Sequence, residues 1–181
     1  MTTPPVFVSG DVLTASQMNS VGLWLIKTQT VGTTVSSVAV TSVFSSDFEN
    51  YRVIYTGGLG STTDYLKLSL GSAVTAYYGS LFGSAYATGT AIGLGVNNQA
   101  SFLYTGLMTS NYAMLSVDIF QPNLVTNTFI KSDWGFNLTG TGYSMFAGEH
   151  SASTAHTGFT ITPTSGTLTS GTISVYGYRK G

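Results

Sequence analysis

The sequence predicts an all-β protein: an antiparallel β-sandwich of the jelly-roll type with one short helix near the N-terminus. Runs of alternating apolar and polar residues, about eight to ten of them, are separated by clusters of Gly, Asn, Ser and Thr at hairpin-like spacing. Only one stretch carries the signals of a helix. With 181 residues, 43% of them hydrophobic, the chain has the size and apolar content of one domain. We expect an N-terminal leader and short docking helix over residues 1–22 and a β-sandwich domain over residues 23–181.

The helix is predicted by the stretch GDVLTASQMN at residues 10–19. Thr14 is a suitable N-cap, and Gln17 completes a capping box with it. Leu13 and Met18 can pack together as a hydrophobic staple. A helix this short needs a surface to dock on, either the end of its own β-domain or a neighbouring subunit. The residues expected to dock and assemble the N-terminal segment are Val6, Phe7, Leu13, Thr14, Gln17, Met18 and Trp24.

Strands account for most of the remaining chain. The expected strands lie within residues 23–31, 34–44, 51–57, 64–70, 113–120, 126–138, 143–148, 158–163 and 171–179. Alternation is clearest in 113–120, and in 51–57 it places Tyr51, Val53 and Tyr55 on one face. In 34–44 the apolar residues change parity, which indicates a bulge or twist. Residues 71–99 are rich in Gly and Tyr and weakly patterned, so we expect long loops or an irregular hairpin there.

Charge is unusually scarce. Only 7% of the residues are charged, the formal net charge is −1, and no charged residue lies between Lys67 and Asp118. Such a surface does not repel a second copy of the chain, so the composition favours a protein that works as an assembly. Disorder is excluded by the aromatic content of 13%, because disordered chains lack aromatic residues. Nucleic-acid binding is not expected, since only Arg179 and Lys180 of the six basic residues are adjacent.

The chain has no cysteine, which excludes disulfides, thiol chemistry and cysteine-based zinc sites. No basic residue precedes Lys27, and no long apolar segment follows the N-terminus, so we expect no secretory signal. The longest apolar run, residues 21–26, is far shorter than the roughly 20 residues that span a bilayer. We expect synthesis in a cytoplasm without an export signal.

Three carboxylates are candidates for catalysis: Asp118, Asp133 and Glu149. A polysaccharide-cleaving enzyme needs two carboxyl groups within roughly 5–10 Å of each other. Asp118 lies at a polar position of its predicted strand and Asp133 beside a turn-forming serine, which favours solvated or capping roles. We therefore assign no catalytic residue.

The segment GEHSASTAH brings Glu149, His150 and His156 close together in sequence. A catalytic zinc site needs three protein ligands, and this spacing is not an established zinc motif. A fortuitous pair of loop histidines is the preferred interpretation, with a histidine ring about a threefold axis as the alternative. We assign no metal-binding or cofactor-binding residue and expect no cofactor.

Tyrosines are the remaining functional signal. Tyr77, Tyr78, Tyr86, Tyr104 and Tyr112 lie in or beside the uncharged segment. Exposed Tyr among Ser, Gly and Asn is typical of adaptable binding surfaces and can stack on sugars or fill a subunit interface. The alternative role for these rings is core packing.

Three stretches carry a resemblance to a known group of proteins: the opening PPVFVSGDVLTASQMNSVGLWLIKTQTVG, the block FENYRVIYTGGLGS and the closing FTITPTSGTLTSGTISVYGYRKG. They resemble small β-rich virion structural proteins of tailed bacteriophages, of the minor tail or tail fibre type. The resemblance implies a non-enzymatic, self-associating protein, a homotrimer, located in the virion with other tail or capsid proteins as partners. The alternatives are a capsid decoration protein that stabilises the head and a module that binds host surface glycans.

Overall fold

The computed structural model of the chain describes residues 9–10, 12, 22–137 and 140–179. In this part of the chain there are 13 strands, every pairing is antiparallel, and no segment forms a helix that could cross a membrane. The prediction of an all-β, antiparallel protein is confirmed. The predicted helix lies outside the described residues.

The strands follow one another through the whole described chain. They are β1 (Leu23–Thr30), β2 (Val38–Val40), β3 (Phe48–Gly60), β4 (Asp64–Leu70), β5 (Tyr77–Ala85), β6 (Ala91–Gln99), β7 (Phe102–Met108), β8 (Ala113–Phe120), β9 (Thr128–Asn137), β10 (Gly140–His150), β11 (Phe159–Pro163), β12 (Leu168–Thr169) and β13 (Thr172–Arg179).

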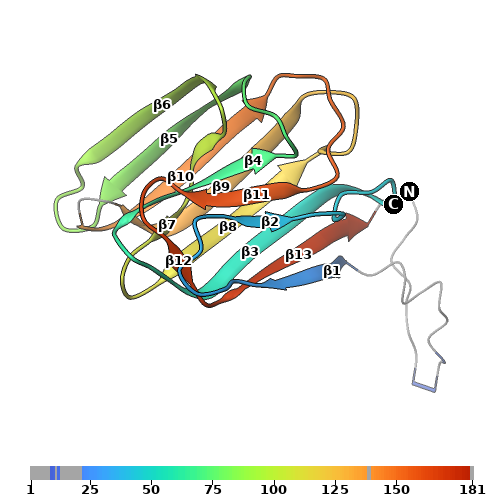
Figure 1. Cartoon of the computed structure of the whole chain (residues 1–181), viewed down its shortest axis with the longest axis horizontal. Coiled ribbons are helices and arrows are strands. Elements are labelled where there is room, and N and C mark those ends of the chain that lie inside the picture. The colour runs from blue at the N-terminus through green and yellow to red at the C-terminus, as the bar shows by residue number, and fades with distance from the viewer. Residues whose placement is uncertain (1–8, 11, 13–21, 138–139, 180–181) are drawn as a thin grey trace.

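The pairing forms two runs of strands that meet at β8 (Figure 1). The long run has the order β6-β5-β10-β9-β8-β3-β13-β1, and the short run has the order β7-β4-β11-β2. On one edge of β8, two strands pair with different parts of it. β7 pairs with residues Ala113 to Leu115, and β9 pairs with residues Val117 to Phe120. The short run therefore branches from the long run at the β7–β8 hairpin.

The inner faces of the two runs share one hydrophobic core. Phe44 connects them at one end, with its ring centroid 5.8 Å from Phe159 of β11 and 4.7 Å from Tyr51 of β3. At the other end, Tyr77 of β5 lies 4.8 Å from Phe102 of β7, again between ring centroids. Aromatic pairs at these separations add to the free energy gained by burying their area. We call the opposite side of the long run its outer face.

Local alternation correctly predicted which residues enter this core. Tyr51, Val53 and Tyr55 of β3 are all 0% exposed, and the inward positions of β8 are buried as well. The strand expected over 34–44 is limited to β2, because Thr34 and Ser42 adopt positive φ angles on either side of it. Positive φ interrupts a strand.

Residues 77–99 form a hairpin after a short loop at residues 71–76, so the expectation of a hairpin in this region is confirmed and that of long loops is wrong. β5 and β6 are nine residues each, joined by a short turn. The hairpin was hard to recognise because Gly and Ser occupy many of its positions and leave little apolar alternation. β7 was not predicted at all.

Candidate functional site

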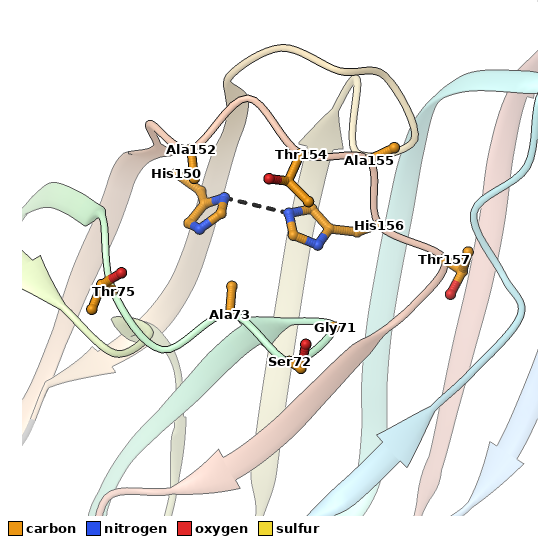
Figure 2. A pocket seen from close by; sticks show the side chains of 10 residues that line it. All are labelled: Gly71, Ser72, Ala73, Thr75, His150, Ala152, Thr154, Ala155, His156 and Thr157. Carbon is orange, nitrogen blue, oxygen red and sulfur yellow. Dashed lines mark hydrogen bonds between the residues drawn. The ribbon is translucent and has the colours of Figure 1, made fainter.

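A pocket of about 470 Å³ lies between the loop that joins β4 to β5 and the loop that joins β10 to β11 (Figure 2). Apart from two imidazoles, its lining consists of small residues, half of them alanine or glycine and half of them serine or threonine. The lining residues are Gly71, Ser72, Ala73, Thr75, His150, Ala152, Thr154, Ala155, His156 and Thr157. His150 is the last residue of β10, and His156 belongs to the following loop.

The two histidines meet at the wall of this pocket. The Nε2 atom of His156 lies 3.4 Å from the Nδ1 atom of His150, and both side chains are buried. Burial lowers the pKa of both imidazoles, and the nearby His150 lowers the pKa of His156 further. Both rings are therefore neutral at pH 7 and are joined by one N–H···N hydrogen bond.

Glu149 does not join this pair. It precedes His150 on β10, and neighbouring residues of a strand point to opposite faces. His150 is inside, while Glu149 is only partly buried and is paired in register with Tyr78 and Phe129 on the outer face. Among the described residues, no three His, Cys, Asp or Glu side chains are grouped as a metal site requires. The burial of both imidazoles does not favour a histidine ring about a threefold axis.

The other two carboxylates, Asp118 and Asp133, also lie on the outer face. Asp118 of β8 forms an ion pair with Arg52 of β3 at 3.6 Å and accepts a hydrogen bond of 2.8 Å from the hydroxyl of Tyr178. The hydrogen bond with Tyr178 raises the pKa of Arg52; burial opposes this increase in part, and the Asp118 charge adds a smaller one. Asp133 of β9 is exposed. Asp118 thus has a structural role, as a partner of Arg52 and Tyr178.

The five candidate tyrosines divide between core and surface. Tyr77 is 0% exposed, and its hydroxyl accepts a hydrogen bond of 2.7 Å from the backbone N of Leu70. Tyr77 is therefore a core residue and cannot stack on a sugar. Tyr104 and Tyr112 are partly buried against the core, and Tyr78 is half-buried. Tyr86, in the β5–β6 turn, is 63% exposed.

Exposed apolar side chains form cross-strand pairs on the outer face. Phe82 of β5 is 57% exposed and lies opposite Met145 of β10, which is 38% exposed. Phe120 of β8 and Phe129 of β9 are likewise opposite each other and exposed. Sequence analysis did not single out these residues. Phe82, Phe129 and Met145 each have an apolar neighbour on the same strand that is the buried one, and with two adjacent apolar residues the alternation does not say which faces inward.

Of the predicted docking and assembly residues, Val6, Phe7, Leu13, Thr14, Gln17 and Met18 lie outside the described residues. Trp24 is on the edge strand β1 and is 49% exposed. Its two neighbours, Leu23 and Leu25, are exposed too. β1 therefore presents an apolar edge where the N-terminal segment enters the sheet.

Comparison of the chain with protein-family models, with curated proteins and with solved structures finds no match. Function is therefore inferred from the fold, the surface chemistry and the resemblance of the sequence.

Proposed function

We propose that this protein is a non-enzymatic structural component of a tailed-bacteriophage virion and works as a self-associated assembly. The observation that carries the proposal is the outer face, with its exposed pairs Phe82–Met145 and Phe120–Phe129. Apolar side chains gathered on one face of a sheet are typical of a surface that a partner covers.

The charges on this face support association. Arg52 and Asp118 neutralise each other in their ion pair, and Lys131 lies directly opposite Asp118 in the register of β8 and β9. Asp133 and Glu149 also lie on this face, so its positive and negative charges nearly balance, and scarce charge is a property of the whole chain. A copy of the same chain is therefore the partner we expect, together with other virion proteins.

For the fold we propose a β-sandwich of the jelly-roll kind. The order β2-β11-β4-β7 in the short run and β3-β8-β9-β10-β5-β6 in the long run is the arrangement expected when a double Greek key of eight strands receives one extra hairpin, β9–β10. Jelly rolls occur in viral capsid proteins and in lectins. This likeness of fold agrees with a virion protein but does not by itself assign a function.

Within the virion we favour a tail fibre or minor tail location, as the sequence resemblance implies, over capsid decoration. The resemblance also implies a trimer. Locating the protein by immunolabelling of intact particles distinguishes a tail position from a head position.

The test of the proposal replaces the outer-face pairs. A Phe82→Ser/Phe129→Ser variant should have a lower assembly mass in sedimentation and be incorporated into particles less than the wild type. The matched control is Val74→Ser/Val125→Ser, which makes the same chemical change at two exposed loop residues. A wild-type chain that remains a 19.0 kDa monomer at high concentration, with particles unchanged in its absence, would refute the proposal.

Glycan binding is a second candidate because two exposed tyrosines lie near the β5–β6 turn. Tyr86 is 63% exposed and Tyr143 of β10 is 41% exposed. Tyr143 lies opposite Ser84, two residues before Tyr86. Exposed rings of this kind can stack on sugar faces. A Tyr86→Ala/Tyr143→Ala variant should then lose binding to host surface polysaccharide while its assembly mass stays unchanged, and retained binding would rule this candidate out.

A further inference from the structure

β6 is a long, unprotected edge of the sheet. Among the described strands it pairs only with β5, and it stands at the free end of the long run (Figure 1). It is nine residues long and mostly exposed. A strand edge usually carries lysine, proline or a strong bulge that prevents pairing with another chain. β6 has no charged residue and no proline. Its register with β5 is regular from Ala91 to Val96, and the register shift of this pair follows Val96.

The hydrogen bonds at the turn define which backbone groups of β6 are unpaired. Ala85 N donates to Thr90 O, and along an antiparallel pair the bonded positions alternate. Ile92 and Leu94 follow Thr90 by two and four residues, so their N–H and C=O groups point toward β5, as the C=O group of Thr90 does. Those of Gly93 and Gly95 point away from the sheet, where a further strand would lie.

The side chains of β6 fit a second copy of the same strand. We propose that β6 pairs antiparallel with β6 of another copy about a twofold axis at Leu94, which adds an edge-to-edge interface to the outer-face contact proposed above. In this register Gly93 of each copy exchanges hydrogen bonds with Gly95 of the other. Leu94 meets Leu94, and Ile92 meets Val96.

This register places apolar side chains together on the inner side. Ile92 already packs against the core and Val96 is buried, whereas Leu94 is 36% exposed. The pairing would bury Leu94 between two copies and continue the hydrophobic core from one chain into the next. On the outer side the two glycines leave open space, because a Cβ atom added at either one would meet no atom within 4 Å. Gly93 and Gly95 therefore place no side chain on the outer side of the paired strands.

The other edges are less suited to this contact. β1 at the opposite end of the long run carries Lys27, whose Nζ donates to Thr41 O at 3.0 Å, and a register shift next to it. β2 is only three residues long. A twofold contact joins copies in pairs, so a trimer with such a contact would assemble further into a dimer of trimers.

A charge at the axis tests the interface. Leu94→Lys places two ammonium groups opposite each other in the paired state, while in a single chain the side chain is partly exposed and can reach water. Sedimentation of the full chain should show a wild-type species that contains an even number of copies, and Leu94→Lys should halve its mass. The matched control, Val125→Lys, adds the same charge at an exposed loop residue and should leave the mass unchanged.

A cross-link provides a second test that does not depend on weakening the assembly. The chain has no cysteine, so Leu94→Cys introduces one thiol per copy. Directly opposed positions of this kind bring Cβ atoms about 4.5–5.5 Å apart, close enough for a disulfide after a small shift. Mild oxidation should yield a covalent dimer, and Val125→Cys should not.

The outcomes separate this interface from the proposed function. An assembly that keeps its mass in Leu94→Lys and gives no Leu94→Cys dimer would overturn β6 pairing and leave self-association standing. A wild-type chain that is a monomer at every concentration would overturn both.

Discussion

The Nε2 atom of His156 lies 3.4 Å from the Nδ1 atom of His150, and this contact joins the end of β10 to the loop that follows it. Opposite the pair, across the pocket, lies the β4–β5 loop (Figure 2). Because the rings are buried, a proton added to either one must be accommodated away from water. The pair thus makes this corner of the fold sensitive to acid.

The first prediction is a loss of stability at mildly acidic pH. Both imidazoles have a pKa below 6.5 in the folded chain, mainly because of burial, so the unfolded chain binds more protons just below pH 6.5. The free energy of unfolding should be highest above pH 6.5. It should decrease below that pH, by at most about 1.4 kcal/mol per pH unit for each additional proton that the unfolded chain binds. Denaturant titrations between pH 7 and 5 measure this slope.

The control for this prediction is His150→Gln/His156→Gln. The chain has only two histidines, so the variant should show a flat stability between pH 7 and 5, whatever its absolute value. An equal slope in the two proteins would mean that the pair does not titrate as expected.

The second prediction concerns alkaline pH. Burial raises the pKa of Tyr55 from 10.0 to about 12. The folded chain therefore holds a proton that the unfolded chain loses, so stability should be constant between about pH 7 and 10 and decrease as the pH rises toward 12. Tyr55→Phe should show a smaller decrease over this range in denaturant titrations. A Tyr55→Phe curve parallel to the wild type would contradict the assignment to Tyr55.

The third prediction tests a buried hydroxyl. The Tyr51 hydroxyl accepts a hydrogen bond of 2.8 Å from Ser45 N and donates one of 2.9 Å to Ser45 O. Tyr51→Phe leaves both backbone groups without this partner and should lower the free energy of unfolding by about 1–3 kcal/mol. Tyr143→Phe, which removes an exposed hydroxyl, should change it by less than about 0.5 kcal/mol. Equal effects of the two substitutions would refute a stabilising role for the Tyr51 contact.

The fourth prediction concerns the β7–β8 hairpin, where the short run branches from the long run. A Cβ atom at Gly106 would lie 2.4 Å from the backbone oxygen of Met114 on the paired strand. Gly106→Ala must push the two strands apart and should cost about 1–3 kcal/mol of stability. Gly93→Ala, which meets no atom within 4 Å, is the control and should leave thermal unfolding of the chain nearly unchanged. A Gly106→Ala variant as stable as the Gly93→Ala variant would contradict this close packing.

The parts of the fold that were predicted depend on local alternation. In β8, strict alternation over eight residues identified the buried face, and in β3 it identified Tyr51, Val53 and Tyr55. Strand pairing was beyond prediction. β11 lies between β2 and β4, and its partners are separated from it by about half of the chain or more, so neither turn residues nor alternation indicates the pairing.

The candidate site was harder to predict than the fold. Proximity in sequence suggested Glu149, His150 and His156 as a group, but alternation along β10 separates the first from the other two. The pocket also needs the β4–β5 loop, which only tertiary structure brings there. Tyr77 was a surface candidate because its neighbours are Ala, Gly and Ser, yet the ring completes the core between β5 and β7.

The pairing of Leu23 with Tyr178 fixes where the two ends of the ordered sheet emerge. Chain that follows β13 therefore begins beside the chain that precedes β1. A purification tag or fluorescent label fused directly after Arg179 would begin close to Leu23 of β1. The β5–β6 turn lies at the other end of the long run, but a label inserted there would stand beside Tyr86 and the β6 edge, where the binding and pairing proposed above would take place.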